Sequence, residues 1–275
     1  MVFLLKGIKR FFRLFLGFKK EKPQPISVVL PKAYRVAFIT GAARRVGAQI
    51  ARTLHENDYK VLIHCHRSTE EAEQLVRELN AIRPDSASVF YHDLSKVEVF
   101  PALMEQAVNC WGKLHLLINN ASCFFSTPLE QTTPLLWNNL MAINLKAPFF
   151  LSQAAWPYLK REEGNIINIA DIHAFSPLRR HAVYSIAKAG LVMATQALAK
   201  EMAPFVRVNA VAPGLVLLPE GENALTAEQQ LKIIEKNYLK RIGMPLDVAQ
   251  ACLYLANANY VTGQVIEVAG GRRGR

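Results

Sequence analysis

Short apolar runs alternate with longer stretches of helical spacing along the chain, from Tyr34 almost to its end. The runs are too short for stable helices and are rich in β-branched residues, so they are typical of buried strands. Strands that alternate with helices predict a parallel sheet covered on both faces, and such strands are apolar on both sides, as these are. We therefore expect one doubly wound α/β domain with a seven-stranded parallel sheet over residues 34–275.

The predicted strands cover residues 35–40, 60–66, 86–92, 114–119, 165–170, 206–211 and 264–268. The predicted helices cover residues 45–57, 69–82, 96–111, 134–160, 182–202 and, in two pieces, 226–257. Ligands of such sheets bind at the carboxyl ends of the strands. The residues expected at that edge are Thr40, Arg67, Asp93, Asn119, Asp171 and Pro213. Residues 215–242 are expected to form a lid over a substrate there.

Residues 164–190 place three proton-carrying groups around one predicted strand and helix. Tyr184 and Lys188 are four residues apart and share one helical face, and Asp171 follows the strand. Because an ammonium lowers the pKa of a nearby phenol, the three groups predict a proton-transfer site. The alternative is that Asp171 only caps the turn after its strand.

The first predicted strand ends in a turn, Thr40 to Gly47, that opens a helix. Gly41 permits the tight turn, Gly47 permits close approach of helix and strand, and the first helical amides suit a pyrophosphate. Arg45, next to Val46, replaces the middle glycine of the usual dinucleotide fingerprint. We expect Arg45 to lean over the phosphates and toward the substrate.

The end of the second predicted strand indicates which dinucleotide binds. An NAD site normally has an acidic residue there for the ribose 2′-hydroxyl, whereas a 2′-phosphate favours an arginine. This chain has His66, Arg67 and Ser68, with no acid before Glu70. We therefore expect NADPH as the cofactor; the alternative is a solvated loop that is basic by chance.

The net charge of +11 lies outside the body of the predicted domain. Residues 1–35 contribute +8 of it, and Arg272, Arg273 and Arg275 contribute the remaining three. A basic footprint for nucleic acid is therefore missing from the fold, and we expect no nucleic-acid partner. The four cysteines have neither metal-ligand nor redox spacing, which predicts packing residues, a reducing compartment and no metal site; they are Cys65, Cys110, Cys123 and Cys252.

Residues 1–33 are predicted to be a basic amphipathic extension followed by a proline-containing linker. In residues 2–20 five basic side chains fall within an arc of about 100° on a helical wheel, namely Lys6, Lys9, Arg10, Arg13 and Lys20. No uncharged run there is long enough for a membrane span or signal peptide. We expect reversible attachment of a cytoplasmic protein to an anionic membrane surface through this segment. The alternatives are docking on another subunit and an organelle presequence.

Residues 34–271 resemble the short-chain dehydrogenase/reductase family. The resemblance rests on the glycine-containing turn, Asp93-Leu94, Asn119-Asn120-Ala121, Asn144, Tyr184-x-x-x-Lys188, Pro213-Gly214 and Val261-Thr262-Gly263-Gln264 with Gly270-Gly271. It implies a Rossmann fold with Tyr184 as the proton donor. It also implies that Lys188 binds the nicotinamide ribose and lowers the pKa of Tyr184, and that Asn144 holds a water. Asp93 and Leu94 would lie near the adenine, with Asn119 to Ala121 and Pro213-Gly214 along the cofactor.

Three departures make the chain resemble the pteridine reductase branch of that family. They are Arg45, the His66-Arg67-Ser68 run, and Asp171 at the place of the usual catalytic serine. This branch implies a pterin sandwiched between the nicotinamide and Phe124, with Arg45 and Ser122 contacting the pterin and the cofactor phosphate. Asp171 and Tyr184 would handle the proton. An ionised carboxylate repels a developing oxyanion but accepts a ring N–H, which favours C=N over ketone reduction.

These observations together predict an NADPH-dependent reductase of dihydropterins or dihydrofolate, with oxidised pterins as further substrates. One alternative is a short-chain carbonyl reductase, such as a 3-oxoacyl-thioester reductase. A second is a non-catalytic, membrane-tethered scaffold, against which the complete Tyr184, Lys188 and Asn144 set argues. The family also suggests a homotetramer, in which Arg272 would reach a neighbouring active site.

Overall fold

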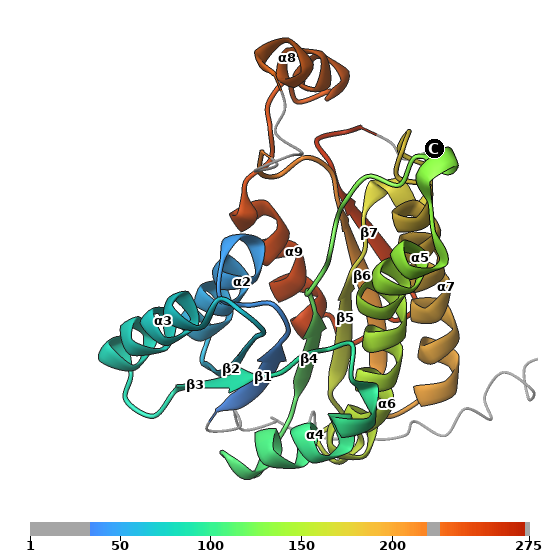
Figure 1. Cartoon of the computed structure of the whole chain (residues 1–275). Helices are drawn as coiled ribbons and strands as arrows, with labels where there is room; N and C mark the ends of the chain where they lie inside the picture. The colour runs from blue at the N-terminus through green and yellow to red at the C-terminus, as the bar shows by residue number, and fades with distance from the viewer. Residues whose placement is uncertain (1–33, 219–225, 273–275) are drawn as a thin grey trace, which may run out of the picture. The chain divides into compact units, whose positions relative to one another are not determined.

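The computed structural model describes residues 34–218 and 226–272, and the expected extension, residues 1–33, lies outside this range. The described chain folds around a seven-stranded, fully parallel sheet with the order β3-β2-β1-β4-β5-β6-β7 (Figure 1). The strands are β1 (Arg35–Ile39), β2 (Tyr59–Cys65), β3 (Ala87–Tyr91), β4 (Leu116–Asn119), β5 (Asn165–Ile169), β6 (Arg207–Pro213) and β7 (Val265–Val268). The strand order reverses between β1 and β4, which is where such sheets bind ligands.

Helices cover both faces of the sheet, as the alternating pattern predicts. On one face Ile50, Leu79 and Val248 join the sheet in one core, and on the other Leu103, Leu151 and Leu198 join it in a second core. The helices of the first face are α2 (Arg45–Glu56), α3 (Thr69–Ile82) and α9 (Pro245–Asn257). Those of the second are α4 (Phe100–Asn109), α6 (Ala147–Arg161) and α7 (Ala182–Met202). The predicted single doubly wound α/β domain is therefore confirmed.

One predicted helix, residues 134–160, is interrupted. It consists of α5 (Pro134–Met141), a five-residue π-helical segment (Ala142–Lys146) and α6. Pro148 has no amide hydrogen, so the carbonyl of Asn144 loses its ordinary helical donor at this point. The segment buries the side chain of Asn144 completely.

Helix α7 lies in the core and carries Tyr184 and Lys188. In the described part of the chain it is the one helix whose length and composition would suit a membrane span. Half of its most apolar stretch is buried and the helix packs on β6, so it is a core helix of this domain. Helix α8 (Ala227–Lys236) stands beyond the carboxyl ends of the strands, where the lid is expected (Figure 1).

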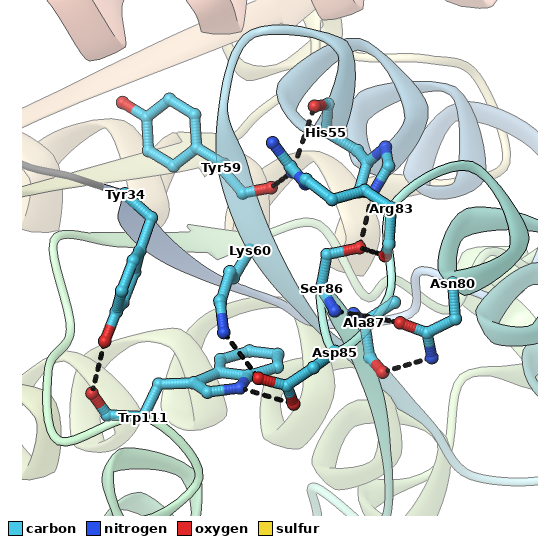
Figure 2. Close-up of polar contacts among 10 residues, drawn as sticks. All are labelled: Tyr34, His55, Tyr59, Lys60, Asn80, Arg83, Asp85, Ser86, Ala87 and Trp111. Atoms are coloured by element: carbon cyan, nitrogen blue, oxygen red, sulfur yellow. Dashed lines mark hydrogen bonds and ion pairs between the residues drawn. The ribbon is translucent and has the colours of Figure 1, made fainter.

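A polar and aromatic cluster lies at the opposite end of the sheet, near the amino ends of β1, β2 and β3 (Figure 2). The Lys60 ammonium lies 4.7 Å from the ring centre of Tyr34 and 4.9 Å from that of Trp111. It also donates a hydrogen bond to Asp85 at 2.7 Å, and the Trp111 indole donates to the same carboxylate at 3.1 Å. Such a cation–π contact stabilises the position of Tyr34 next to β1.

The four cysteines are free thiols. Cys65 and Cys252 are buried and Cys123 is half-buried, as expected of packing residues. Cys110 is exposed at the end of α4, so the prediction of a packing role is wrong for that residue.

Candidate active site

Two cavities open at the carboxyl ends of the strands, and Arg45 and Val46 line both. The first, here called the turn cavity, has a volume of about 580 Å³ and lies over the turn between β1 and α2. Most of the expected cofactor-binding residues line it, namely Gly41, Arg45, Val46, Gly47, His66, Arg67, Ser68, Asp93, Leu94, Ala121 and Ser122. The second, here called the tyrosine cavity, has a volume of about 570 Å³ and contains Tyr184 and Asp171 in its wall.

The turn at the amino terminus of α2 has the properties of a phosphate-binding site. No side chain caps the helix and no acidic residue lies in its first turn, so its first amides remain open to an anion. The backbone at Gly41 lies very close to that at Ala121: a Cβ atom on Gly41 would lie 2.9 Å from the Cα of Ala121. Arg45 occupies the left-handed region with φ of 55°, which explains why a glycine is usual at this position. These residues fit the pyrophosphate of a dinucleotide.

The end of β2 is basic, as predicted, and a buried histidine supports it. His66 and Arg67 are exposed at the wall of the turn cavity. His64, which sequence analysis did not single out, accepts a hydrogen bond from the Gly41 amide at 3.2 Å and contacts the His92 carbonyl at 3.1 Å. Burial lowers the pKa of His64 to about 4, so the ring is neutral and fixes the turn.

The asparagine that faces the turn cavity is Asn120 rather than Asn119. The side chain of Asn119 is buried and donates to Asn168 at 2.8 Å and to Ser152 at 3.2 Å, which joins β4 to its neighbours below the cavity. Asn120 lines the cavity and donates to the carbonyls of Thr40 and Gly41 at 2.9 and 3.0 Å. The side chain of Asn119 is therefore used inside the protein, and the place of Asn119 along the cofactor stays a prediction.

Tyr184 and Asp171 form a direct pair in the wall of the tyrosine cavity. The Tyr184 hydroxyl donates to Oδ2 of Asp171 at 2.8 Å. The other carboxylate oxygen, Oδ1, accepts the amide of His173 at 2.8 Å and caps the short turn Ile172–Ala174. One oxygen of Asp171 thus caps the turn, as the alternative expects, and the other lies where the predicted proton-transfer site needs it, beside the phenol.

The structure changes one expectation about the phenol. Burial first, and then the neighbouring Asp171 carboxylate, raise the pKa of Tyr184 well above its usual value, and the Ser122 hydroxyl opposes them. Lys188 is completely buried and donates to the Ile169 carbonyl at 2.8 Å, and burial lowers the pKa of its ammonium to about 8. The pKa of Tyr184 is thus raised, not lowered as expected from Lys188, and the phenol stays protonated, as a proton donor must be.

Asn144 and Ser122 shape the segment that leads to Phe124. The Asn144 amide donates to the carbonyls of Cys123 and Leu140 at 2.9 and 3.0 Å, and its oxygen accepts the Ser122 hydroxyl at 2.7 Å. Both amide hydrogens of Asn144 are therefore used inside the protein, and the residue positions Ser122 and Cys123. Ser122 itself lines the turn cavity.

Phe124 and the segments that follow β5 and β6 line the tyrosine cavity. Its wall includes Phe124, His181 and Leu217, and also Gly214, which was expected along the cofactor. The ring of Phe124 stands edge-on to that of Tyr184 with centroids 4.9 Å apart. Pro213 ends β6 and, like Lys188, belongs to the wall of neither cavity. The ring of Phe124 and the Tyr184–Asp171 pair thus lie next to each other in the wall of the cavity.

Comparison with known proteins identifies the family of the chain. Residues 41–273 match the family model described as enoyl-(acyl carrier protein) reductase. The protein named as ketoacyl reductase 2 of the granaticin polyketide synthase, from Streptomyces violaceoruber, is 34% identical over 86% of this chain and 95% of its own length. Pteridine reductase 1 of Leishmania tarentolae is 31% identical over the same shares of the two chains. The 3-oxoacyl-(acyl-carrier-protein) reductase FabG of Staphylococcus aureus is 32% identical over 87% of this chain and 98% of its own.

These relatives share reductase activity in their names and align over nearly their full length with this chain. Together with the parallel sheet, the dinucleotide turn and the tyrosine–lysine pair on α7, they define its class. The chain is a NAD(P)H-dependent oxidoreductase and belongs to the short-chain dehydrogenase/reductase family.

Proposed function

We propose that this protein is an NADPH-dependent pteridine reductase that converts dihydropterins or dihydrofolate, and also oxidised pterins, to more reduced forms. The observation that carries the proposal is the 2.8 Å hydrogen bond from the Tyr184 hydroxyl to Asp171. A carboxylate at this place accepts hydrogen bonds and disfavours the oxyanion that ketone reduction produces. It suits a substrate whose ring nitrogens carry N–H groups.

Reduction of a ring C=N bond requires hydride at the carbon and a proton at the nitrogen. When bound, the nicotinamide supplies the hydride. Tyr184 supplies the proton, because its raised pKa keeps it protonated, and Asp171 holds the phenol hydrogen in position between turnovers. Phe124 offers a flat apolar face for the pterin rings, and Arg45, in the wall of both cavities, faces the cofactor phosphates and the substrate. Lys188 would bind the nicotinamide ribose.

NADPH is proposed over NADH because of the basic end of β2. Arg67 and His66 are exposed at the wall of the turn cavity, and the described part of that wall has Asp93 as its one acidic residue, at the end of β3. A 2′-phosphate is attracted by a guanidinium, whereas a free 2′-hydroxyl is normally bound by a carboxylate after β2.

The rival function is reduction of a 3-oxoacyl thioester, which two of the named relatives favour at 32 to 34% identity. Oxidation of NADPH by the purified full chain separates the two, with 7,8-dihydrobiopterin in one assay and an acetoacetyl thioester in the other. The proposal expects turnover with the pterin and little with the thioester. Turnover with the thioester alone would make the protein a carbonyl reductase, and no turnover with either would support the scaffold.

Assembly and location are also proposed. We expect a homotetramer, because α6 and α7 expose large apolar side chains at Phe149, Trp156 and Met193 that a second copy would cover. Sedimentation of the full chain measures this directly. The protein is further proposed to be cytoplasmic and to touch anionic membranes through residues 2–20.

A further inference from the structure

Basic side chains lie over aromatic rings at the amino ends of the strands. Because the sheet is fully parallel, the segments that lead into its strands meet at this end, opposite the two cavities. Three pairs of this kind come from different segments, so the pairing is a property of this end of the domain. Measured from the charged group to the ring centre, they are Lys160 over Phe205 at 4.5 Å, Arg161 over Tyr158 at 5.6 Å and Lys113 over Tyr34 at 5.9 Å.

Part of this end is uncovered in the described chain. Lys160 and Arg161 are exposed, Phe205 is 44% exposed, and Tyr260, in the turn before β7, is fully exposed. Single apolar residues on a surface need no explanation. Aromatic rings combined with lysine and arginine, however, are typical of a membrane–water interface, where the rings lie among the headgroups and the charged ends stay in water.

The charge of this end complements an anionic surface. Several of its carboxylates are engaged within the protein; the pairs are Asp85 with Lys60 at 2.7 Å, Asp58 with Arg83 at 3.5 Å and Glu162 with His115 at 3.2 Å. In the described part of the chain Lys113, Lys160 and Arg161 have no carboxylate partner, although Glu163, which follows them, is exposed. Basic groups therefore remain in excess there, and anionic lipid headgroups attract such groups.

The basic extension joins the domain at this same end. Tyr34, the first described residue, contacts the Trp111 carbonyl at 3.5 Å, and its ring lies beside Lys60 (Figure 2). Residues 1–35 carry +8 of the net charge. Once an attached segment binds a bilayer, a surface beside its attachment point meets the lipid at high effective concentration, so contacts that are too weak alone still add affinity.

We propose that this end of the domain is a second membrane-contact surface, which binds anionic lipid headgroups while the cavities at the other end stay open to water. The inference rests on the proposed membrane contact of residues 2–20 and goes beyond it, because it assigns a lipid contact to the folded domain and orients the active site away from the bilayer. The surface, here called the amino-end face, consists of Tyr34, Lys113, Lys160, Arg161, Phe205 and Tyr260.

The first test measures sedimentation of the full chain with vesicles of phosphatidylcholine and phosphatidylserine. In Lys160→Gln/Arg161→Gln the lipid concentration for half-maximal binding is expected to rise about tenfold, because each basic group near an anionic surface adds to the attraction. Phe205→Ser, which removes an interfacial ring, is expected to raise it about threefold. Arg77→Gln/Lys232→Gln removes two exposed charges on α3 and α8 as the matched control and stays within about twofold of the native chain. Both double variants keep the native melting temperature.

The second test measures which end of the domain faces the bilayer. Cys110 is exposed and precedes Trp111, so an environment-sensitive dye is attached to it in a Cys123→Ser background. Vesicles that contain phosphatidylserine are expected to shift the emission of this dye to the blue. The same dye on α8, in Lys232→Cys/Cys110→Ser in that background, keeps its emission, because α8 stands at the other end (Figure 1).

Equal sedimentation of the native chain and Lys160→Gln/Arg161→Gln, with an unshifted dye at Cys110, overturns the amino-end face and leaves residues 2–20 as the whole membrane contact. Equal dye shifts at Cys110 and on α8 overturn the proposed orientation. A shift at Cys110 that follows protein concentration without vesicles identifies a second copy as the occupant and also overturns the face. If the native full chain fails to sediment, the proposed contact of residues 2–20 is overturned together with this inference.

Discussion

The imidazole ring of His181 lies flat against the ring of Phe124, with centroids 4.5 Å apart and planes 9° from parallel. The Nδ1 atom of His181 contacts the Arg179 carbonyl at 3.0 Å, which fixes the imidazole in its turn. One face of Phe124 is thereby covered by His181, while the side chain stays 36% exposed in the wall of the tyrosine cavity. His181 is thus a positioning residue for the aromatic wall of the tyrosine cavity.

Replacing His181 by Ala removes the support of Phe124. Loss of a stacked aromatic contact is worth about 1 kcal/mol, so the KM for the pterin is expected to rise about fivefold. Steady-state kinetics with the pterin and NADPH varied in turn measure this. The KM for NADPH stays constant, and His181→Phe, which keeps a stacked ring, retains most of the native pterin KM. An equal rise in both KM values would contradict the positioning role.

Substituting Asp171 by Ser removes the carboxylate from the phenol. Pterin reduction is expected to fall about a hundredfold or more, the usual contribution of a placed proton-transfer group. Because Asp171 raises the pKa of Tyr184, the ionisation of that phenol shifts to lower pH in the variant, and an ultraviolet difference titration against Tyr184→Phe measures the shift. Full pterin activity in Asp171→Ser would remove the basis of the proposed specificity.

Substituting Arg67 by Asp tests the cofactor assignment. The new carboxylate repels a 2′-phosphate and accepts a ribose hydroxyl, so the preference for NADPH over NADH is expected to invert, with the NADPH KM rising about tenfold. Kinetics with both cofactors at saturating substrate give the ratio. Lys96→Gln, a loss of charge outside the wall of the turn cavity, serves as a control. An unchanged NADPH to NADH preference would mean that the basic loop after β2 does not bind the 2′-phosphate of the cofactor.

Buried Lys188 gives the stability a defined pH dependence. Its pKa is lowered to about 8 in the folded protein from 10.5, so between these values the unfolded chain binds more protons and stability rises with pH. Relative to Lys188→Met, the free energy of unfolding of the native chain is expected to rise by about 2 kcal/mol from pH 7 to pH 10. Urea titrations of both proteins across this range measure it. A flat difference would show that Lys188 is charged throughout.

The expected membrane contact can be tested with the chain lacking residues 1–22. The full chain is expected to sediment with liposomes that contain anionic lipid and to be released by salt, because the attraction is largely electrostatic. The truncated chain stays in the supernatant and keeps its reductase activity. Equal sedimentation of the two forms would end the proposal, and loss of activity would indicate docking on another subunit.

Much of the fold could be predicted from the sequence because burial on both sides of a parallel sheet leaves a plain apolar pattern. Strand β5, for example, is buried at all five positions from Asn165 to Ile169, and the predicted run differs from it by one residue. The turn at Gly41 could be predicted equally well, because Gly41 and Gly47 stand where the backbone is left-handed or another segment approaches too closely for a side chain. Helical spacing placed Tyr184 and Lys188 on one face of a helix, and α7 carries both residues.

Features that depend on side-chain direction could not be predicted in this way. Asn119 and Asn120 are neighbours at a strand end, and the sequence does not tell that β4 ends at Asn119, whose side chain is buried, so that Asn120 lines the cavity. His64 looks like any strand residue until the Gly41 amide is placed beside it. The pKa of Tyr184 depends on how deeply the phenol is buried, which no motif records.

The π-helical segment at Ala142–Lys146 has a consequence for how this site can vary. A π-helical turn holds one more residue than an α-helical turn. Deleting a single residue there would convert it to an α-helical turn and rotate α5 about the helix axis by about 100° relative to α6. Thr133 and α5 would then swing away from α7, while the hydrogen bonds of Asn144 to Cys123 and Leu140 would be lost together. Substitutions in this stretch are therefore easier to accommodate than any change in its length.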